Sequence, residues 1–275
     1  MTQNRSFRRS RPLRRRTCCA FLFCLLPIAA CAFAEAQSPA PAGASLPDAP
    51  TAQAPAQDEA TLRDAPHDIL RDQAAVWTSP VRLRPRDLEW LAPLALATGA
   101  AIATDHRAMT QVVSRDPDFN QANIDASNAL IGGWIAAPVA IYGYGHFHPS
   151  PHAREAGILS GEAMVDSVVV EQGMKLIFWR ERPGVDNSRG RFFQSNVGAD
   201  SSFPSSHSLI AWSAASALAG EYPSHWTQFA LYSAATGVSI TRVIGQQHFP
   251  SDVLVGSATG WLIGHYVSHR RHRRP

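Results

Sequence analysis

The stretch PSSHSLIAWSAASALAG, residues 204–220, joins a short polar segment to an Ala- and Leu-rich run. A serine directly before such a run is the usual start of an α-helix, so we predict a helix over 206–220. The first turn of a helix carries backbone N–H groups without intrahelical partners, and such groups bind anions. His207 lies on this turn. The segment is therefore either a helix cap alone or a cap that also forms half of a phosphate site.

Apolar segments of helical length recur on both sides of this stretch, and strand patterns are scarce. The turn EYPSHW after residue 220 is short, so the helices before and after it should be antiparallel neighbours. We predict an all-α, six-helix bundle. Its helices are expected at 86–104, 121–144, 154–182, 206–220, 226–243 and 251–269.

The N-terminus has the three parts of a bacterial export signal, which we place at residues 1–34. Seven arginines precede an apolar segment that begins at Cys18, and small residues follow. Residues 32–34 form an A-x-A cleavage site. Residues 28–31 resemble a lipoprotein box that would leave Cys31 lipidated. A short membrane anchor is the alternative, although Pro27 interrupts the apolar segment.

Loss of the signal changes the charge of the chain. Without the seven arginines, 18 basic residues face 22 acidic ones, a net charge of −4, so the basic precursor gives no indication of nucleic-acid binding. All four cysteines belong to the signal, and we expect the core to be held by packing without disulfides.

The composition divides the rest of the chain into three parts. Residues 35–80 are predicted to be a Pro- and Ala-rich disordered tether and a lead-in, because few bulky apolar side chains are available there to form a core. Residues 81–269 are the helical domain. Residues 270–275 form a basic tail that can contact anionic lipid.

Polar residues gather at particular ends of the predicted helices. Lys175 and Arg182 are two helical turns apart and so share a face of the third helix, while His248 and Asp252 span the start of the sixth. Taken singly, these are also typical of solvated helix ends and of a structural His–Asp hydrogen bond. An up-and-down bundle brings all these ends together, and cations beside a helix N-terminus predict a site for a tetrahedral oxyanion. The residues gathered there are Lys175, Arg182, Ser205, Ser206, His207, Arg242, His248 and Asp252.

Three segments then match known signatures. KLIFWRERP (175–183) fits K-x6-R-P, PSSH (204–207) resembles P-S-G-H, and TRVIGQQHFPSD (241–252) fits S-R-x5-H-x3-D with Thr241 for serine. Together they resemble the type 2 phosphatidic acid phosphatases, which share a fold with bacterial acid phosphatases and vanadium-dependent haloperoxidases. Ser206 departs from the pattern, since it stands where the family usually has glycine.

The resemblance implies a role for each residue. His248 would attack phosphorus to give a phosphohistidine, Asp252 would orient its ring, and His207 would protonate the leaving group. No metal or other cofactor is implied. The phosphate would be bound by Lys175, Arg182, Ser205, Ser206, His207 and Arg242.

The resemblance therefore predicts a metal-independent phosphoric monoester hydrolase. Its substrate would be a phosphorylated small molecule or a lipid phosphate or pyrophosphate, and not a nucleic acid. The alternatives are a vanadate-dependent haloperoxidase and a degenerate anion-binding envelope protein. We expect an exported protein on the periplasmic side, tethered or peripheral, because Glu162, Asp166 and Glu171 would be costly against lipid. An integral inner-membrane protein is the alternative.

Overall fold

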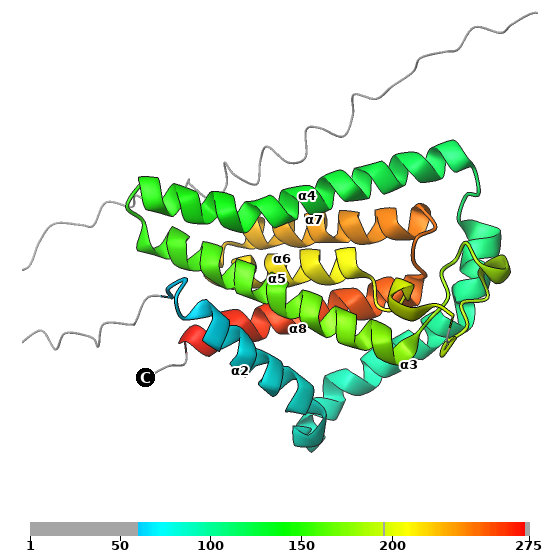
Figure 1. Cartoon of the computed structure of the whole chain (residues 1–275), viewed down its shortest axis with the longest axis horizontal. Helices are drawn as coiled ribbons and strands as arrows, with labels where there is room; N and C mark the ends of the chain where they lie inside the picture. Colours follow the sequence, from blue (N-terminus) through cyan, green and yellow to red (C-terminus); the bar gives the residue numbers. More distant parts are fainter. Residues whose placement is uncertain (1–59, 195, 273–275) are drawn as a thin grey trace, which may run out of the picture. The chain divides into compact units, whose positions relative to one another are not determined.

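The computed structural model describes residues 60–194 and 196–272, which are helical and contain no β-strand (Figure 1). This confirms the predicted all-α fold, and the six predicted helices correspond to α3–α8. The export signal, residues 35–59 of the tether and the last three residues of the tail lie outside the described residues. The helices are α2 (Ala65–Thr78), α3 (Leu88–Arg107), α4 (Pro117–Phe147), α5 (Pro151–Phe178), α6 (Ser206–Glu221), α7 (His225–Ile244) and α8 (Pro250–His272).

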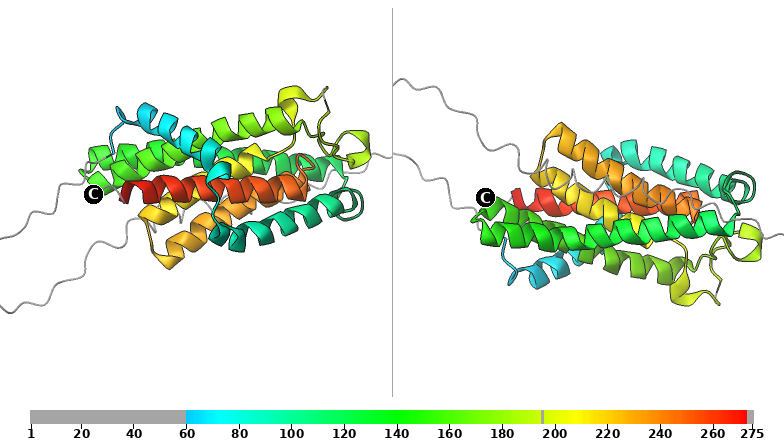
Figure 2. Two further views of the ribbon diagram at one scale, coloured as in Figure 1. Left: turned by 90° about the horizontal axis from the view of Figure 1, so that it is seen from below. Right: turned by 90° about the horizontal axis from the view of Figure 1, so that it is seen from above.

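Helix α6 forms the interior of the bundle, and α5, α7 and α8 pack around it (Figure 2). Its Ala-rich sequence allows this position, because small side chains let neighbouring helices approach closely. The contact with α8 is closest at Gly260 and Gly264, where an added Cβ would collide with the backbone carbonyls of Leu209 and Ser213. The small residues of α6 and α8 thus allow close packing of the two helices that carry Ser206, His207 and Asp252 of the predicted site.

From α3 to α8, successive helices run in alternating directions (Figure 1), as predicted for α6 and α7, which are separated only by residues 222–224. Local signals set the starts of α4 and α5. Asp116 caps α4 by accepting hydrogen bonds from the N–H groups of Asp118 and Phe119, at 3.0 and 3.3 Å. Ser150 caps α5 through the N–H of Ala153, at 3.3 Å. As a result, α5 and α7 end where α6 and α8 begin.

Part of the predicted lead-in is ordered, because residues 65–78 form α2 and pack against α5. Arg270 on α8 holds this helix through buried ion pairs. Its Nη2 lies 3.5 Å from Asp68 Oδ2 and 3.1 Å from Glu162 Oε2, and its Nη1 contacts Asp72. These partners come from α2 and α5, both far from Arg270 in the chain, so the charged sequence around residue 70 gave no sign that its carboxylates are buried.

The third predicted helix ends earlier than expected. The sequence places its end at residue 182, but α5 stops at Phe178 because Trp179 takes a left-handed conformation with φ = 38°. The prediction that Arg182 shares a helical face with Lys175 is therefore wrong. Arg182 lies in the loop that leads to α6, and this loop, not helical periodicity, places its side chain.

Candidate active site

The candidate site lies at the end of the bundle where α5 and α7 end and α6 and α8 begin, and all eight predicted residues are at this end. Direct bonds link several of them. Lys175 Nζ donates to Ser206 Oγ at 3.1 Å, and the N–H of Ser205 donates to the backbone carbonyl of Asp252 at 3.1 Å. The loop after α5 and the first half of α4 complete the surroundings.

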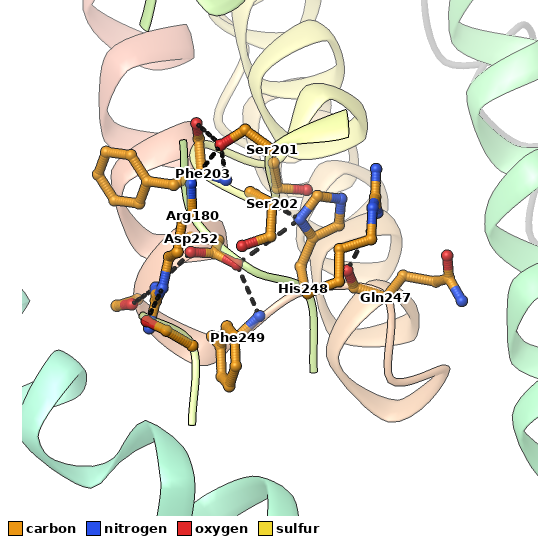
Figure 3. Close-up of polar contacts among 12 residues, drawn as sticks. Arg180, Ser201, Ser202, Phe203, Gln247, His248, Phe249 and Asp252 are labelled. Carbon is orange, nitrogen blue, oxygen red and sulfur yellow. Dashed lines mark hydrogen bonds and ion pairs between the residues drawn. The ribbon is translucent and has the colours of Figure 1, made fainter. Parts of the chain in front are cut away.

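The ring of His248 is fully enclosed and has a defined orientation (Figure 3). Its Nδ1 lies 2.7 Å from the carbonyl oxygen of Ser202 and 3.7 Å from Asp252 Oδ2. A carbonyl oxygen can only accept a hydrogen bond, so Nδ1 carries the proton and Nε2 keeps its lone pair. The predicted His248–Asp252 pair is present at ion-pair distance, but the closest partner of the ring is a backbone group that no motif reveals.

Asp252 is itself held by two groups. Its Oδ2 accepts the N–H of Phe249 at 2.8 Å, and its Oδ1 accepts a short hydrogen bond from Arg180 Nη1. Arg180 is 1% exposed, and its Nη2 donates to Asp105 Oδ2 on α3 at 2.6 Å. Its guanidinium lies over the ring of Phe249, 4.2 Å from the centroid. Asp252 therefore keeps its position whether or not His248 is charged.

Arg180 and Asp105 were not predicted from the sequence. Arg180 is one of the variable positions of K-x6-R-P, and only its apolar neighbours Phe178 and Trp179 suggested that its guanidinium was buried. Asp105 lies 75 residues before Arg180 and has no distinctive pattern around it. Their pairing depends on where α3 packs against α8, which the sequence alone does not specify.

The three predicted cations differ in their surroundings. Arg242 is buried, donates from Nη1 to Ser127 Oγ at 3.1 Å, and has no hydrogen-bond partner at Nε. Arg182 is partly exposed and pairs with Asp200 Oδ1 at 3.0 Å. Lys175 is buried and forms an ion pair with Glu171 at 2.7 Å. Cations therefore reach the site from α5, the following loop and α7.

The start of α6 leaves its first N–H groups available. Ser205 occupies the N-cap position, but its side chain makes no capping hydrogen bond. The first intrahelical bond runs from the N–H of Leu209 to the Ser205 carbonyl, at 3.0 Å. The N–H groups of residues 206–208 therefore point out of the helix end, where an anion would bind. The hydroxyl of Ser206 is already used, because it donates to Glu171 Oε1 at 2.6 Å.

His207 lies among these cations, with Nε2 3.2 Å from Asn128 Oδ1. Burial lowers the pKa of His207 to about 3, and the positive charges of Arg242, His248, Lys175 and Arg182 add to this effect. Burial also lowers the pKa of His248, against the opposing effect of Asp252. Both rings are therefore neutral at pH 7 in the empty site. A bound phosphate dianion would raise both pKa values, because its charge stabilises the imidazolium form.

Within residues 60–194 and 196–272, no three His, Cys, Asp or Glu side chains form a group that could hold a metal ion. The histidines at positions 146, 148 and 152 lie where α4 ends and α5 begins. That is the end of the bundle opposite the candidate site.

Comparison with known families finds one match. Residues 156–275 match the family model of the PAP2 superfamily. The match includes all three signature segments and so confirms the resemblance inferred from them.

Two individual proteins are similar to the chain. One is a lipid A 1-phosphatase from Porphyromonas gingivalis, 38% identical over 79 residues, which are 28% of this chain and 18% of the relative. The chain thus matches less than a fifth of that protein's length. The other is the crystal structure of a transmembrane PAP2-type phosphatidylglycerolphosphate phosphatase from Bacillus subtilis. It is 19% identical, with a TM-score of 0.45, covering 78% of this chain and 96% of that one.

Arg180 is buried and Arg182 is partly exposed, so we predict that they contribute differently to the free energy of unfolding. Arg180→Met should lower the free energy of unfolding by about 3–5 kcal/mol, because it leaves the buried carboxylates of Asp105 and Asp252 without their partner. Arg182→Met is the control and should cost at most about 1 kcal/mol, since its ion pair with Asp200 is exposed to solvent. Chemical denaturation of both variants measures the difference. Equal losses would contradict the structural role assigned to Arg180.

Proposed function

We propose that the protein is a metal-independent phosphatase that acts through a phosphohistidine intermediate. The observation that carries this proposal is the fixed tautomer of His248, whose unprotonated Nε2 stands among the cations and helix N-terminus of the site. Phosphoryl transfer needs little else, because it depends mainly on positioning and on stabilising spread negative charge.

The geometry supports a reaction in two displacements. In the first, Nε2 of His248 bonds to phosphorus as the bond to the leaving oxygen breaks, and His207 donates a proton to that oxygen. The Ser202 carbonyl and Asp252 stabilise the imidazolium that forms. In the second, water attacks the phosphohistidine, with His207 accepting its proton, and inorganic phosphate is released. Because the pKa of His207 is about 3 without a bound anion, His207 takes up its catalytic proton only once the charge of the bound phosphate group has raised this pKa.

Two other functions remain to be separated from this one by experiment. A vanadate-dependent haloperoxidase would use the same kind of pocket, with vanadate bound to a histidine, and would oxidise bromide with peroxide. A degenerate site would bind anions without turnover. The complete set of signature cations and both histidines favours a working phosphatase.

A phosphate-release screen tests the proposal. It compares p-nitrophenyl phosphate and soluble monoesters with lipid phosphates and lipid pyrophosphates in mixed micelles, with EDTA present throughout. We expect turnover that persists in EDTA and is inhibited by orthovanadate, which mimics the pentacoordinate transition state. Loss of activity on chelation, restored by a divalent ion, would disprove the metal-independent mechanism. Bromide oxidation without phosphate release would favour the haloperoxidase.

Replacing His248 and replacing His207 should affect turnover differently, and the effect of replacing His207 should depend on the leaving group of the substrate. His248→Ala removes the attacking atom and should abolish turnover of every substrate and the trapping of a phosphoenzyme. His207→Ala removes proton donation, worth about 10²–10⁴-fold, and should harm an alkyl phosphate more than p-nitrophenyl phosphate, whose leaving group needs no proton. Steady-state rates on both substrates measure this. Equal losses for His207→Ala would assign it a role in positioning phosphate only.

The outer surface of the bundle favours a lipid substrate. Large apolar side chains are exposed on α3, α4, α5 and α7, among them Leu96 (75%), Val139 (73%) and Trp226 (77%). Helix α4 is long and apolar enough to cross a membrane, and only 22% of its most apolar window is buried. A core helix of a water-soluble bundle would be mostly buried. We propose that these faces contact lipid.

The charged residues of α5 agree with this arrangement. In the sequence, Glu162, Asp166 and Glu171 argue against an integral protein, because they would be costly against lipid. In the structure all three are at most 4% exposed and point into the bundle, as does Lys175. The outward face of α5 carries apolar residues such as Val168 and Leu176 instead. The objection therefore does not hold, and we favour a membrane-embedded enzyme over a tethered or peripheral one, with its site on the periplasmic side after export directed by residues 1–34.

Extraction from membranes distinguishes these arrangements. A membrane-embedded bundle should stay in the pellet after washing with alkaline carbonate or high salt and dissolve only in detergent, because exposed apolar area has no favourable place in water. Immunoblotting of the fractions measures this. Recovery in the carbonate supernatant would support a peripheral protein. Loss of the tether by proteolysis beforehand separates a lipid anchor from an embedded bundle.

A further inference from the structure

A buried carboxylate lies inside the cationic site. Glu171 precedes Lys175 by one helical turn on α5, and both side chains are less than a tenth exposed. Its Oε1 lies 2.7 Å from Lys175 Nζ and accepts the hydroxyl of Ser206 at 2.6 Å. Its Oε2 accepts Gln172 Nε2 at 2.7 Å. Each oxygen of Glu171 is thus held, and the carboxylate has a fixed position beside the phosphate site.

Counting hydrogens shows what this network leaves for a ligand. The ammonium of Lys175 has three hydrogens, of which one is directed to Glu171 and one to Ser206 Oγ. Ser206 gives its own hydrogen to Glu171. Ser206 therefore offers no side-chain donor to phosphate, and one hydrogen of Lys175 remains. The contacts with Glu171 and Ser206 fix the direction of that remaining hydrogen, and the negative charge of Glu171 reduces the effective charge of Lys175.

The reduced effective charge of Lys175 matters because the other carboxylates near the site oppose anion binding less than Glu171 does. The buried carboxylate of Asp252 is matched by Arg180, and Asp200 beside Arg182 is 80% exposed, so solvent screens its charge. Arg242 is buried beside the neutral hydroxyl of Ser127. Glu171 is the buried carboxylate in direct contact with a signature cation, and its charge opposes the binding of an anion there.

We propose that Glu171 is a positioning residue of the phosphate site, which acts with Ser206 to aim Lys175 and to limit how tightly inorganic phosphate is held. The proposal rests on the phosphatase function above. It also gives Ser206 a role, since its hydroxyl makes the link between Glu171 and Lys175 that a glycine at this position would lack. Weaker binding of inorganic phosphate favours its release as the product. A correctly oriented Lys175 ammonium stabilises the transition state.

Glu171→Gln tests the proposal, with Glu155→Gln as the matched control. Glu155 lies on the same helix but about 24 Å away, at a rise of 1.5 Å per residue. In Glu171→Gln the inhibition constant of inorganic phosphate should fall about tenfold, because a buried unit charge is removed near the anion. We expect kcat to fall by a similar factor, since Lys175 is no longer aimed. Glu155→Gln should change neither.

Two variants keep the test decisive if Glu171→Gln does not fold. Glu171→Asp retains the charge but shortens the side chain, so phosphate affinity should stay near that of the wild type while kcat falls. Ser206→Ala retains both charges and removes the link, and should likewise lower kcat more than it changes phosphate affinity. Wild-type values for both constants in these variants would overturn the proposal. So would a loss of thermal stability alone, with both constants unchanged.

Calorimetric titration with inorganic phosphate separates this inference from the proposed function. Binding without turnover of any ester by the wild type would contradict the phosphatase function, yet tighter binding by Glu171→Gln would still support the role of Glu171. Equal binding by the wild type and Glu171→Gln, in an enzyme that hydrolyses phosphate esters, would contradict the role of Glu171 alone.

Discussion

The guanidinium of Arg180 holds together three segments on which the site depends. It bonds to Asp105 at the end of α3, to Asp252 in the first turn of α8, and to the Gly190 carbonyl in its own loop, at 3.2 Å. Asp252 in turn lies beside His248. A buried guanidinium is costly unless its donors are satisfied, so this arrangement tolerates few alternatives. Its main consequence is a defined geometry for the loop and for the ring of His248.

Charge compensation is uneven across the site. Asp252 and Glu171 each have a cationic partner, whereas Arg242 is buried next to a hydroxyl and keeps Nε without a partner. Positive charge therefore exceeds negative charge where the N–H groups of α6 emerge. Burial lowers the pKa of His207, and this excess of positive charge lowers it further. The charge of an anion bound there would raise the pKa of His207 again.

The bundle also separates its polar interior from an apolar exterior. The ionisable residues in the middle of α5 point inward, where Glu162 pairs with Arg270 and Glu171 with Lys175. Many outward positions on α4 and α5 are apolar, among them Val139 and Val168. Such an inversion of the usual pattern is typical of a protein whose surroundings are themselves apolar, because there the charged groups can find partners only inside. A lipid phosphate substrate would meet this site from the same environment.

The sequence by itself determined the helical fold, the order of the six main helices and the convergence of Lys175, His207, Arg242 and His248 at one end of the bundle. These follow from local signals: apolar runs of helical length, short turns, and polar residues placed at helix ends. Only the tertiary structure decided which polar groups meet. Ser202 as the partner of His248, Asp105 as the partner of Arg180, and the packing of α2 on Arg270 depend on contacts between segments far apart in the chain. Helical periodicity fixes the face of a residue but not the neighbouring segment that covers it, so burial and pairing of these groups could not be predicted locally.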